Sequence, residues 1–480
     1  MPRRGPMAPE SIRFALADSI AFLNASDWDR VAARSGLFLS RRFLGLVEQN
    51  RPENLTLHYA LAYTEGRPLA AIVAQSLDVR AANLFSRPAK EAGPGIWRSL
   101  EKATLRSITR GRKRILLFEA LLPWARLDGT EQAAEEPELW PEVASSLGRK
   151  WRGLLKTAEL AAELPVAWVR QRMLVCGNLL STGPHGVAFA EGEDPARLWP
   201  AVEEAISRIR RSNKLFGDSD LVMIKDLTDG QKDAAAALRR FHFRRFETEP
   251  NMILACKPGW RSFEDYLSEM RSEYRIRIRK TISNLEASGI VLERLGAEQV
   301  KAKAAEIHAL YLQVHERKKL RLVTIGPQWI PALAASFGDD FRTIAARQKE
   351  GGKLLGFVNV LRDGDRAHGL YIGFDKAAAA KGVPLYLGLV YAVIRQGIEM
   401  GAGQISLGRT ALGPKAQIGA KAQAMYGYLR HRNPALNLAV PSILALLPTP
   451  DEPPQRHPFK NAAPGAIEKE HQMENPRSAR

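Results

Sequence analysis

Cysteine is scarce in this sequence: Cys176 and Cys256 are its only cysteines among 480 residues. Two cysteines build no disulfide framework, and no cysteines and histidines are spaced as metal ligands, which suits a reducing cytosol. The sequence also has no Walker-type phosphate loop and no strong GxSxG nucleophile motif. We therefore expect no metal site, no nucleotide binding by a Walker-type loop and no nucleophilic serine of the GxSxG type.

Long apolar runs are absent as well. No run approaches the roughly 20 residues that span a bilayer, and Asp18 interrupts the apolar stretch that follows the basic, proline-rich residues 1–10. Residues 448–480 have few apolar groups and the composition of a disordered tail. We expect a flexible N-terminus over residues 1–10, a disordered tail over residues 448–480, and a cytoplasmic protein, soluble or peripheral at the inner face of the membrane.

Positive charge is abundant, with a formal net charge of +18. Such an excess favours an anionic partner: the phosphates of CoA, those of a tRNA, or the anionic face of a membrane. The alternative is that the arginines reflect genome composition and solubility. The length and the 45% hydrophobic content are those of two or three domains with proper cores.

The most informative stretch is residues 367–432. An apolar strand over 368–374 ends in a small-residue loop, and Lys381 and Gly382 precede a helix with Pro384 at its first position. A short strand follows at 404–407. The free N–H groups of a helix start carry partial positive charge, so this turn predicts a cradle for a pyrophosphate. An ordinary strand-to-helix turn with a solvated lysine is the alternative.

The elements before this stretch complete a recognisable order. A strand over 289–294, a helix over 300–318 and two strands over 340–348 and 353–361, joined by a hairpin signal, precede it. This order resembles the GNAT N-acyltransferase fold, whose acyl-CoA loop follows the fourth strand. The resemblance implies acyl-CoA as a co-substrate and no permanently bound cofactor. The loop lacks the glutamine or arginine and the spaced glycines usual in that family, so only Lys381 and Gly382 carry over.

Residues 262–289 form a basic amphipathic helix in this interpretation. Ser262 and Asp265 have the spacing of a capping box. Positive side chains gather on one face and are candidates for binding an anionic partner: Arg271, Arg275, Arg279 and Lys280. A solvated charged face is the alternative.

This helix, together with Arg409 in a Gly-Arg-Thr turn, Lys415 and Lys421, resembles the FemAB-related, BioF2-like branch of the GNAT superfamily over residues 261–432. Members of that branch transfer acyl or aminoacyl groups to amines. On this resemblance we assign Arg409, Lys415 and Lys421, with Lys381 and Gly382, to the binding of acyl-CoA.

The first half repeats the order of the second. Strands are expected at 186–190, 221–224 and 251–256, with helices at 194–210 and 232–243 between them. We therefore predict an α/β fold of two tandem GNAT-like modules, each a mixed central sheet flanked by helices. Residues 11–258 form the acceptor side and residues 259–440 the donor side, because the acidic loop 191–194 would repel a pyrophosphate.

The loop over residues 177–186 concentrates glycine, amide and hydroxyl groups between two apolar runs. It presents Asn178 and His185 as catalytic candidates, since histidine is the usual proton acceptor near neutral pH. A tight connection with a hydrogen-bonded histidine is equally compatible. His315 and Tyr371 are the other candidates for the base.

These observations predict an N-acyltransferase that moves an acyl group from acyl-CoA to an amine. The apolar residues 436–447 and the basic face favour a lipidic or membrane-associated amine, such as a sphingoid-type base. Two alternatives remain: transfer of an amino acid from aminoacyl-tRNA to a cell-wall precursor, and a non-catalytic binding module. A tRNA partner belongs only to the first alternative, and no DNA partner is expected.

Overall fold

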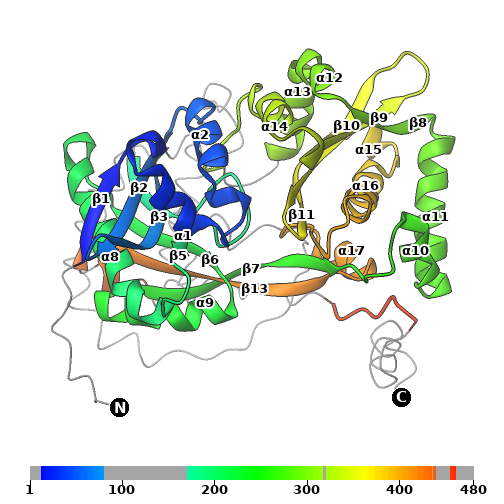
Figure 1. Ribbon diagram of the computed structural model, residues 1–480. Helices are drawn as coiled ribbons and strands as arrows, with labels where there is room; N and C mark the ends of the chain where they lie inside the picture. Colours follow the sequence, from blue (N-terminus) through cyan, green and yellow to red (C-terminus); the bar gives the residue numbers. More distant parts are fainter. Residues whose placement is uncertain are drawn as a thin grey trace, which may run out of the picture.

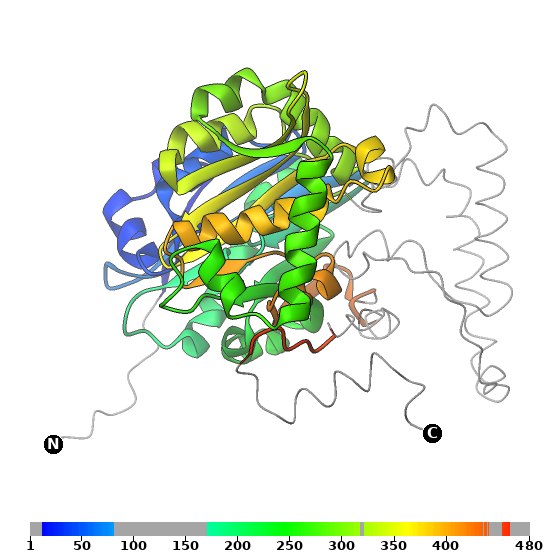
Figure 2. The ribbon, with the colours of Figure 1, turned by 90° about the vertical axis from the view of Figure 1, so that its right-hand side faces the viewer.

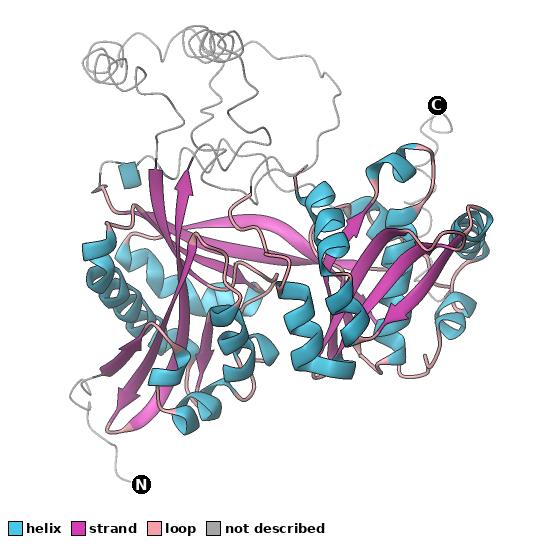
Figure 3. Ribbon diagram, turned by 90° about the horizontal axis from the view of Figure 1, so that it is seen from above, coloured by secondary structure: helices cyan, strands magenta, loops and turns pink. Residues whose placement is uncertain are grey.

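The computed structural model describes residues 12–80, 170–316, 321–434, 454–460 and part of 436–440. These residues form one mixed sheet of thirteen strands flanked by helices (Figures 1 and 3). The strand order is β1-β2-β3-β4-β6-β13-β7-β12-β11-β10-β9-β8, and β5 pairs with β3 outside this path.

The first half of the chain supplies the strands β1 to β7. Its elements are β1 (Arg13–Ala17), α1 (Ala25–Ala32), η2 (Leu37–Leu39), α2 (Arg41–Gln49), β2 (Leu55–Thr64), β3 (Arg67–Arg80), β4 (Arg170–Cys176), β5 (Val187–Phe189), α8 (Pro195–Ser212), β6 (Leu221–Leu227), α9 (Asp229–Ala234), η5 (Ala235–Phe241) and β7 (Arg244–Ala255). Asp194 caps α8, where its side chain accepts the N–H of Ala196 and Pro195 occupies the first turn, as the sequence predicts.

The second half supplies β8 to β13. Its elements are α10 (Phe263–Ser268), α11 (Ser272–Ala287), β8 (Ile290–Leu295), α12 (Ala297–Ala302), α13 (Ala304–His315), α14 (Trp329–Phe337), β9 (Phe341–Gln348), β10 (Leu354–Asp363), β11 (Arg366–Phe374), α15 (Lys376–Ala380), α16 (Leu385–Glu399), β12 (Gln404–Ser406), α17 (Leu412–Gln417) and β13 (Lys421–His431). Helix α16 is almost wholly apolar and buried between the sheet and the helices α10 and α11 (Figure 2).

The two halves have the same topology. In the first, β1 to β4 are antiparallel and β6 lies parallel to β4; in the second, β8 to β11 are antiparallel and β12 lies parallel to β11. The last strand of each half crosses over: β7 pairs with β12, and β13 pairs with β6. The predicted α/β fold of two tandem modules is confirmed, and the exchanged strands join both modules into one sheet (Figure 1).

A shared apolar core also joins the modules. Phe43 of α2 lies 6.1 Å from Trp329 and 6.3 Å from Phe337 of α14, measured between ring centroids. These rings belong to one continuous cluster that includes the buried residues Trp28 and Phe357. Separating the modules would expose this cluster to water, so the space between them is a fixed part of the fold.

The structure differs from the predicted helix over 262–289. Ser262 and Asp265 form the expected capping box at α10, but the chain breaks before α11. At the break, Met270 forms a β-bridge with Phe459, and the N–H of Arg271 donates to the carbonyl of Pro458 at 2.8 Å. Residues 454–460, assigned from the sequence to a disordered tail, therefore pack on the second module. The rest of that tail and residues 1–10 lie outside the described residues.

Smaller differences concern element boundaries. The helix predicted over 300–318 is two helices, α12 and α13; the small-residue loop after β11 contains α15; and the helix predicted over 232–243 is α9 followed by the 3-10 helix η5. Pro384 is the N-cap of α16 rather than its first residue. Strand β7 begins earlier than predicted, because a bulge opposite residues 423–425 of β13 accommodates Pro250.

The apolar stretch 436–447 is described only in part. Leu436 and Leu438 are 54% and 73% exposed, whereas Val440 is buried against the first module. Among the described helices, none has the length and apolar character needed to cross a bilayer.

Candidate active site

Strands β11 and β12 diverge after a short parallel contact. Their pairing runs from Arg366 to His368 on β11 and ends at Ser406 on β12. Just beyond, a bulge over Leu370 and Tyr371 gives β11 one residue more than β10. Bulges bend a strand and end its pairing. The backbone of residues 369–371 therefore borders an open space instead of β12.

This space is a cavity of about 210 Å³. Its walls come from both modules: residues 368–371 of β11, Ser406 and Gly408, Tyr311 and His315 of α13, Val323, Ile325, and residues 179–182 of the first module. Tyr371 links the walls, because its hydroxyl donates to the carbonyl of Leu180 at 2.8 Å and accepts the indole N–H of Trp329 at 2.8 Å. The β11/β12 cavity is thus complete only with the first module in place.

The corresponding space in the first module is filled. Beyond the parallel contact of β4 and β6, the buried side chain of Lys225 occupies it, and a Cβ at Gly177 (φ +141°) would come within 2.4 Å of the Lys225 Cγ. The Lys225 ammonium donates to the carbonyls of Asn178 at 2.9 Å and Ser181 at 3.2 Å. This side chain therefore fixes the loop that walls the β11/β12 cavity.

A buried ion cluster ties this loop to the second module. Asp226, 1% exposed, accepts from Lys225 Nζ at 2.5 Å, from the N–H of Gly183 at 3.0 Å, and from Arg409 of the second module. Burial opposes ionisation of Asp226, but the charges of Arg409 and Lys225 hold its pKa well below the usual range. Its φ of 63° is unusual for a residue other than glycine, although aspartate tolerates it.

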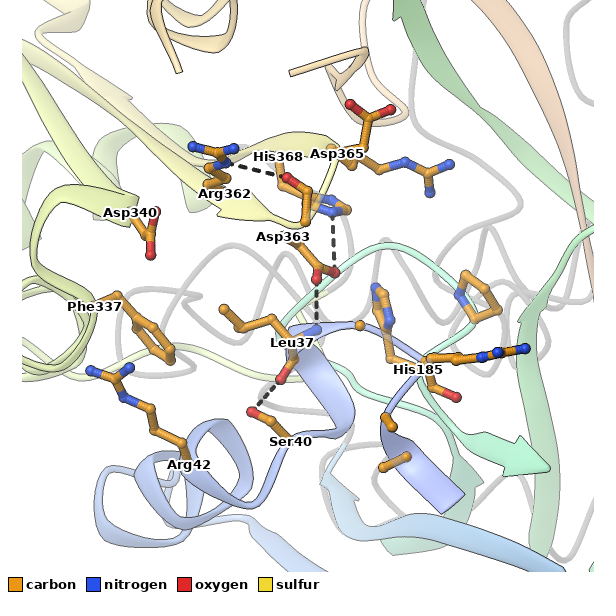
Figure 4. A pocket seen from close by; sticks show the side chains of 18 of the residues that line it. Leu37, Ser40, Arg42, His185, Phe337, Asp340, Arg362, Asp363, Asp365 and His368 are labelled. Carbon is orange, nitrogen blue, oxygen red and sulfur yellow. Dashed lines mark hydrogen bonds and ion pairs between the residues drawn. The ribbon is translucent and has the colours of Figure 1, made fainter. Parts of the chain in front are cut away.

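A larger groove of about 1190 Å³ lies between the modules (Figure 4). One wall is the segment between α1 and α2, and the other is the tip of the β10–β11 hairpin. The walls meet where the N–H of Leu37 donates to Asp363 Oδ1 at 2.7 Å. Gly36 has a φ of +81°, and a Cβ there would lie 2.5 Å from Asp363 Oδ2, so this approach requires glycine.

Charged side chains of both signs line the inter-module groove. The acidic ones are Asp29, Asp340, Asp363 and Asp365. The basic ones are Arg34, Arg42, Arg362 and Arg366. Such a lining fits a polar ligand with charges of its own.

His368 lines both the groove and the β11/β12 cavity. The residue is 4% exposed, its ring packs edge-on against Phe38, and Nε2 lies 3.8 Å from Asp363 Oδ2. Burial lowers the pKa of His368 to about 3 and raises that of Asp363. The ring is therefore neutral near physiological pH, beside a carboxylate that can stabilise its protonated form.

His185 reaches the same groove from the first module (Figure 4). Its Nε2 lies 3.1 Å from the carbonyl of Thr182, so in the neutral ring Nε2 carries the hydrogen. Nδ1 is then an acceptor, and it is buried without a hydrogen-bond partner among the described residues. Phe38 packs against the rings of both His185 and His368, whose centroids are 6.3 Å apart.

The other predicted catalytic residues occupy different places. His315 and Tyr371 line the β11/β12 cavity, where the ring Nε2 of His315 lies 3.0 Å from the Thr324 hydroxyl. Asn178 is 1% exposed and lines neither cavity; its side-chain oxygen accepts the N–H of Leu180 at 2.9 Å. The catalytic roles of these residues stay predictions.

The five residues assigned to acyl-CoA lie on different elements. Lys381 and Gly382 form the exposed turn between α15 and α16. Arg409 is engaged by Asp226, and Lys415 is buried with its ammonium 3.3 Å from the carbonyl of Gly408. Lys421 is exposed at the start of β13. Within the described part of the chain, none of the five lines the groove or the β11/β12 cavity.

The predicted basic face has internal partners. Arg271 pairs with Glu273 at 3.1 Å and Arg279 with Glu264 at 2.8 Å. Arg275 donates to the carbonyl of Met270 at 3.1 Å, and Lys280 is exposed on α11. Binding of an anionic partner by this face stays a prediction.

Sequence reasoning missed three residues: His368, Asp363 and Asp226. The sequence pattern predicts only that His368 lies in a strand. The Asp363-Gly364 pair is a hairpin signal that would have placed Asp363 and His368 on neighbouring strand ends. Asp226 gives no such signal, because its partner Arg409 is 183 residues away.

Buried histidines predict loss of stability in acid. Burial lowers the pKa of His58 to about 4 and those of His185 and His368 to about 3, from an ordinary value of 6.5. Below pH 6.5 the unfolded chain therefore binds more protons than the folded chain, and stability falls toward the folded pKa values. Each histidine contributes up to about 1.4 kcal/mol per pH unit. We expect the free energy of unfolding from urea titrations to fall steeply below pH 6.5.

His185→Gln should flatten this pH dependence. Equal slopes for the parent and the His185 variant would contradict the prediction.

Comparison with known protein families finds a match in the second module. Residues 272–416 match the family model of the acetyltransferase (GNAT) domain. This stretch runs from α11 to α17 and contains β11 and β12, so it supplies one wall of the β11/β12 cavity. No curated protein sequence matches the chain significantly.

Solved structures show similarity at low sequence identity. A tandem GNAT protein from the clavulanic acid biosynthesis pathway has a TM-score of 0.44 and 10% identity, covering 88% of this chain and 99% of that one. FemX has a TM-score of 0.38 and 11% identity, covering 58% and 85%. L-PGS from Bacillus licheniformis has a TM-score of 0.37 and 12% identity, covering 58% and 82%.

Proposed function

We propose that this protein is an N-acyltransferase that moves an acyl group from an acyl-CoA to an amine. The observation that supports this most is that His368 lines two spaces: the β11/β12 cavity, whose β11 and β12 walls lie in the stretch that matches the GNAT domain model, and the groove between the modules. A cavity of about 210 Å³ is smaller than a typical ligand pocket of about 300 Å³ or more. It suits the acyl and thioester end of the donor, while the amine enters through the groove.

The chemistry needs a base and a polarised carbonyl. The acceptor ammonium first loses one proton to solvent in the groove. As the neutral nitrogen attacks the thioester, the neutral His368 ring takes a second proton from it, and Asp363 stabilises the resulting imidazolium. Backbone N–H groups beside the bulge over Leu370 and Tyr371 polarise the thioester carbonyl. The amine nitrogen bonds to the carbonyl carbon, the carbon–sulfur bond breaks, and the His368 imidazolium gives its proton to the leaving thiolate. No covalent enzyme intermediate is needed.

The rest of the donor lies outside the cavity. On the resemblance to GNAT proteins, its pyrophosphate reaches the turn between α15 and α16, where Lys381 is exposed. The first module offers no second donor site among the described residues, because Lys225 fills the space between β4 and β6. One donor per chain is therefore expected.

The experiment is calorimetric titration of the full-length protein with acetyl-CoA, paired with a melting curve. We expect one equivalent to bind and to raise the melting temperature, since a ligand selective for the native state stabilises it. Ser181→Phe should abolish both effects, because Ser181 lines the β11/β12 cavity. Ser288→Phe, at the exposed end of α11, is the matched control.

Two bound equivalents, or normal binding by Ser181→Phe, would contradict this donor site. No binding to a folded protein would contradict acyl-CoA as donor. Mass spectrometry of copurified ligand then distinguishes the alternatives, since the net charge of +18 also suits a tRNA. A lipidic acceptor and contact with an anionic membrane remain proposals from the sequence.

A further inference from the structure

We propose that the amine acceptor also carries an acidic group, and that it binds in the inter-module groove with its amine at His368 and its acid at Arg366. This inference rests on the proposed function and names the acceptor class: a short molecule with one amine and one carboxylate or phosphate.

The tip of the β10–β11 hairpin brings both charge types to one point. Its sequence is Arg362-Asp363-Gly364-Asp365-Arg366, all five residues line the groove, and Asp363 pairs with Arg366 across the strands. Gly364, with a φ of +57°, makes the tight turn. Within this short hairpin, the carboxylate of Asp363 and the guanidinium of Arg366 therefore both line the inter-module groove.

Asp363 marks the amine end. Its Oδ1 is occupied by the Leu37 N–H, while Oδ2 faces the His368 ring at 3.8 Å, and this carboxylate is 16% exposed. A cationic ammonium from solution is attracted to this position. His368 also lines the β11/β12 cavity, so an amine held here lies beside the thioester.

Arg366 marks the acid end. Its guanidinium donates to Gln404 Oε1 at 2.7 Å, and it forms no ion pair with another residue of the described ranges. Arg34, by contrast, pairs with Glu191 at 2.6 Å, and the guanidinium of Arg42 lies over the ring of Phe337. Arg366 therefore has donors left for a ligand, and it lies directly across the hairpin from Asp363, close to the amine end.

An acidic group on the acceptor keeps the acceptor bound after its amine has lost its positive charge. The amine must lose its proton before it attacks, and it then loses its attraction to Asp363. A carboxylate or phosphate on arginine keeps the acceptor in place throughout, because such charge-assisted pairs are strong and directional. A long-chain base without an acid would leave Arg366 facing an alkyl chain, which is unfavourable for a cation.

The experiment uses matched acceptors with acetyl-CoA and the full-length protein, and it measures thiol release. The pairs are leucine with leucinamide, and O-phosphoethanolamine with ethanolamine; sphinganine in neutral vesicles tests the lipidic class. We expect the acid member of at least one pair to have a kcat/KM about 10- to 100-fold higher than its neutral partner. The pair that responds tells carboxylate from phosphate.

Variants assign the preference to Arg366. Arg366→Gln should raise KM for the acidic acceptor and remove the preference, and Arg366→Lys should restore part of it. Arg294→Gln, on the surface of β8, should keep it. Equal rates for acid and neutral members, or faster transfer to sphinganine, would overturn this inference and leave the N-acyltransferase proposal standing. No thiol release with any amine would instead count against the proposed function.

Discussion

Changing His368 to glutamine should lower kcat for acyl transfer by about 10²-fold or more, the loss expected when a general base is removed. His368 is the residue shared by the β11/β12 cavity and the inter-module groove, so an amine and a thioester can both reach it. Glutamine keeps much of the volume but cannot accept the proton. KM for acetyl-CoA should change little, because the imidazole does not hold the donor. Thiol release at saturating acetyl-CoA measures the effect.

The matched control is His58→Gln, which removes a buried histidine that lines neither space. It should keep kcat, although it will cost stability. The dependence of kcat on pH is a second measurement. Because the pKa of His368 is lowered to about 3, protonation of this base should not reduce the kcat of the parent as the pH falls through 6.5. Activity of His368→Gln equal to that of the parent, with both folded, would move the base to His185, His315 or Tyr371.

The sequence correctly predicted features that depend on residues close together in the chain, such as helices and their caps. Helix α16 follows from apolar residues at helical spacing that begin after Pro384 and stop before Gly401. The cap of α8 by Asp194 and the capping box at Ser262 are contacts between residues at most three positions apart. Because such signals depend on neighbours in the chain, they also revealed that the second half repeats the first.

The sequence could not predict what depends on distant segments. The exchange of β7 and β13 between modules, the filling of the first cleft by Lys225, and the contact of Leu37 with Asp363, 326 residues away, have no local pattern. Arg409 is an example of a residue whose partner lies far away in the sequence. The sequence predicts its Gly-Arg-Thr turn at the acyl-CoA site, and that role stays a prediction; the structure adds a pairing of its guanidinium with Asp226 across the module boundary. Charge in a sequence indicates binding capacity, and tertiary packing decides what is bound.

The ion cluster at Asp226 predicts the largest stability effect. Asp226→Asn should lower the free energy of unfolding by about 3–5 kcal/mol, because it leaves the buried Lys225 and the partly buried Arg409 without their counter-charge. Asparagine tolerates the left-handed backbone at this position, so the charge is the main change. Asp218→Asn is the matched control: that residue pairs with Arg432 at 2.5 Å but is 43% exposed, and its loss should cost at most about 1 kcal/mol.

The same cluster should control donor binding, since Lys225 and Asp226 hold the loop that walls the β11/β12 cavity. Asp226→Asn should therefore also weaken acetyl-CoA binding in calorimetry at a temperature where the variant is folded. Adding Arg409→Gln removes one of the two unpaired cations, so the double variant should lose less stability than the sum of the single changes. Additive losses, or a cost for Asp226→Asn no larger than for Asp218→Asn, would show that the three charges do not act as a unit. In that case the loop of residues 179–182 must be held in place mainly by its contact with Tyr371.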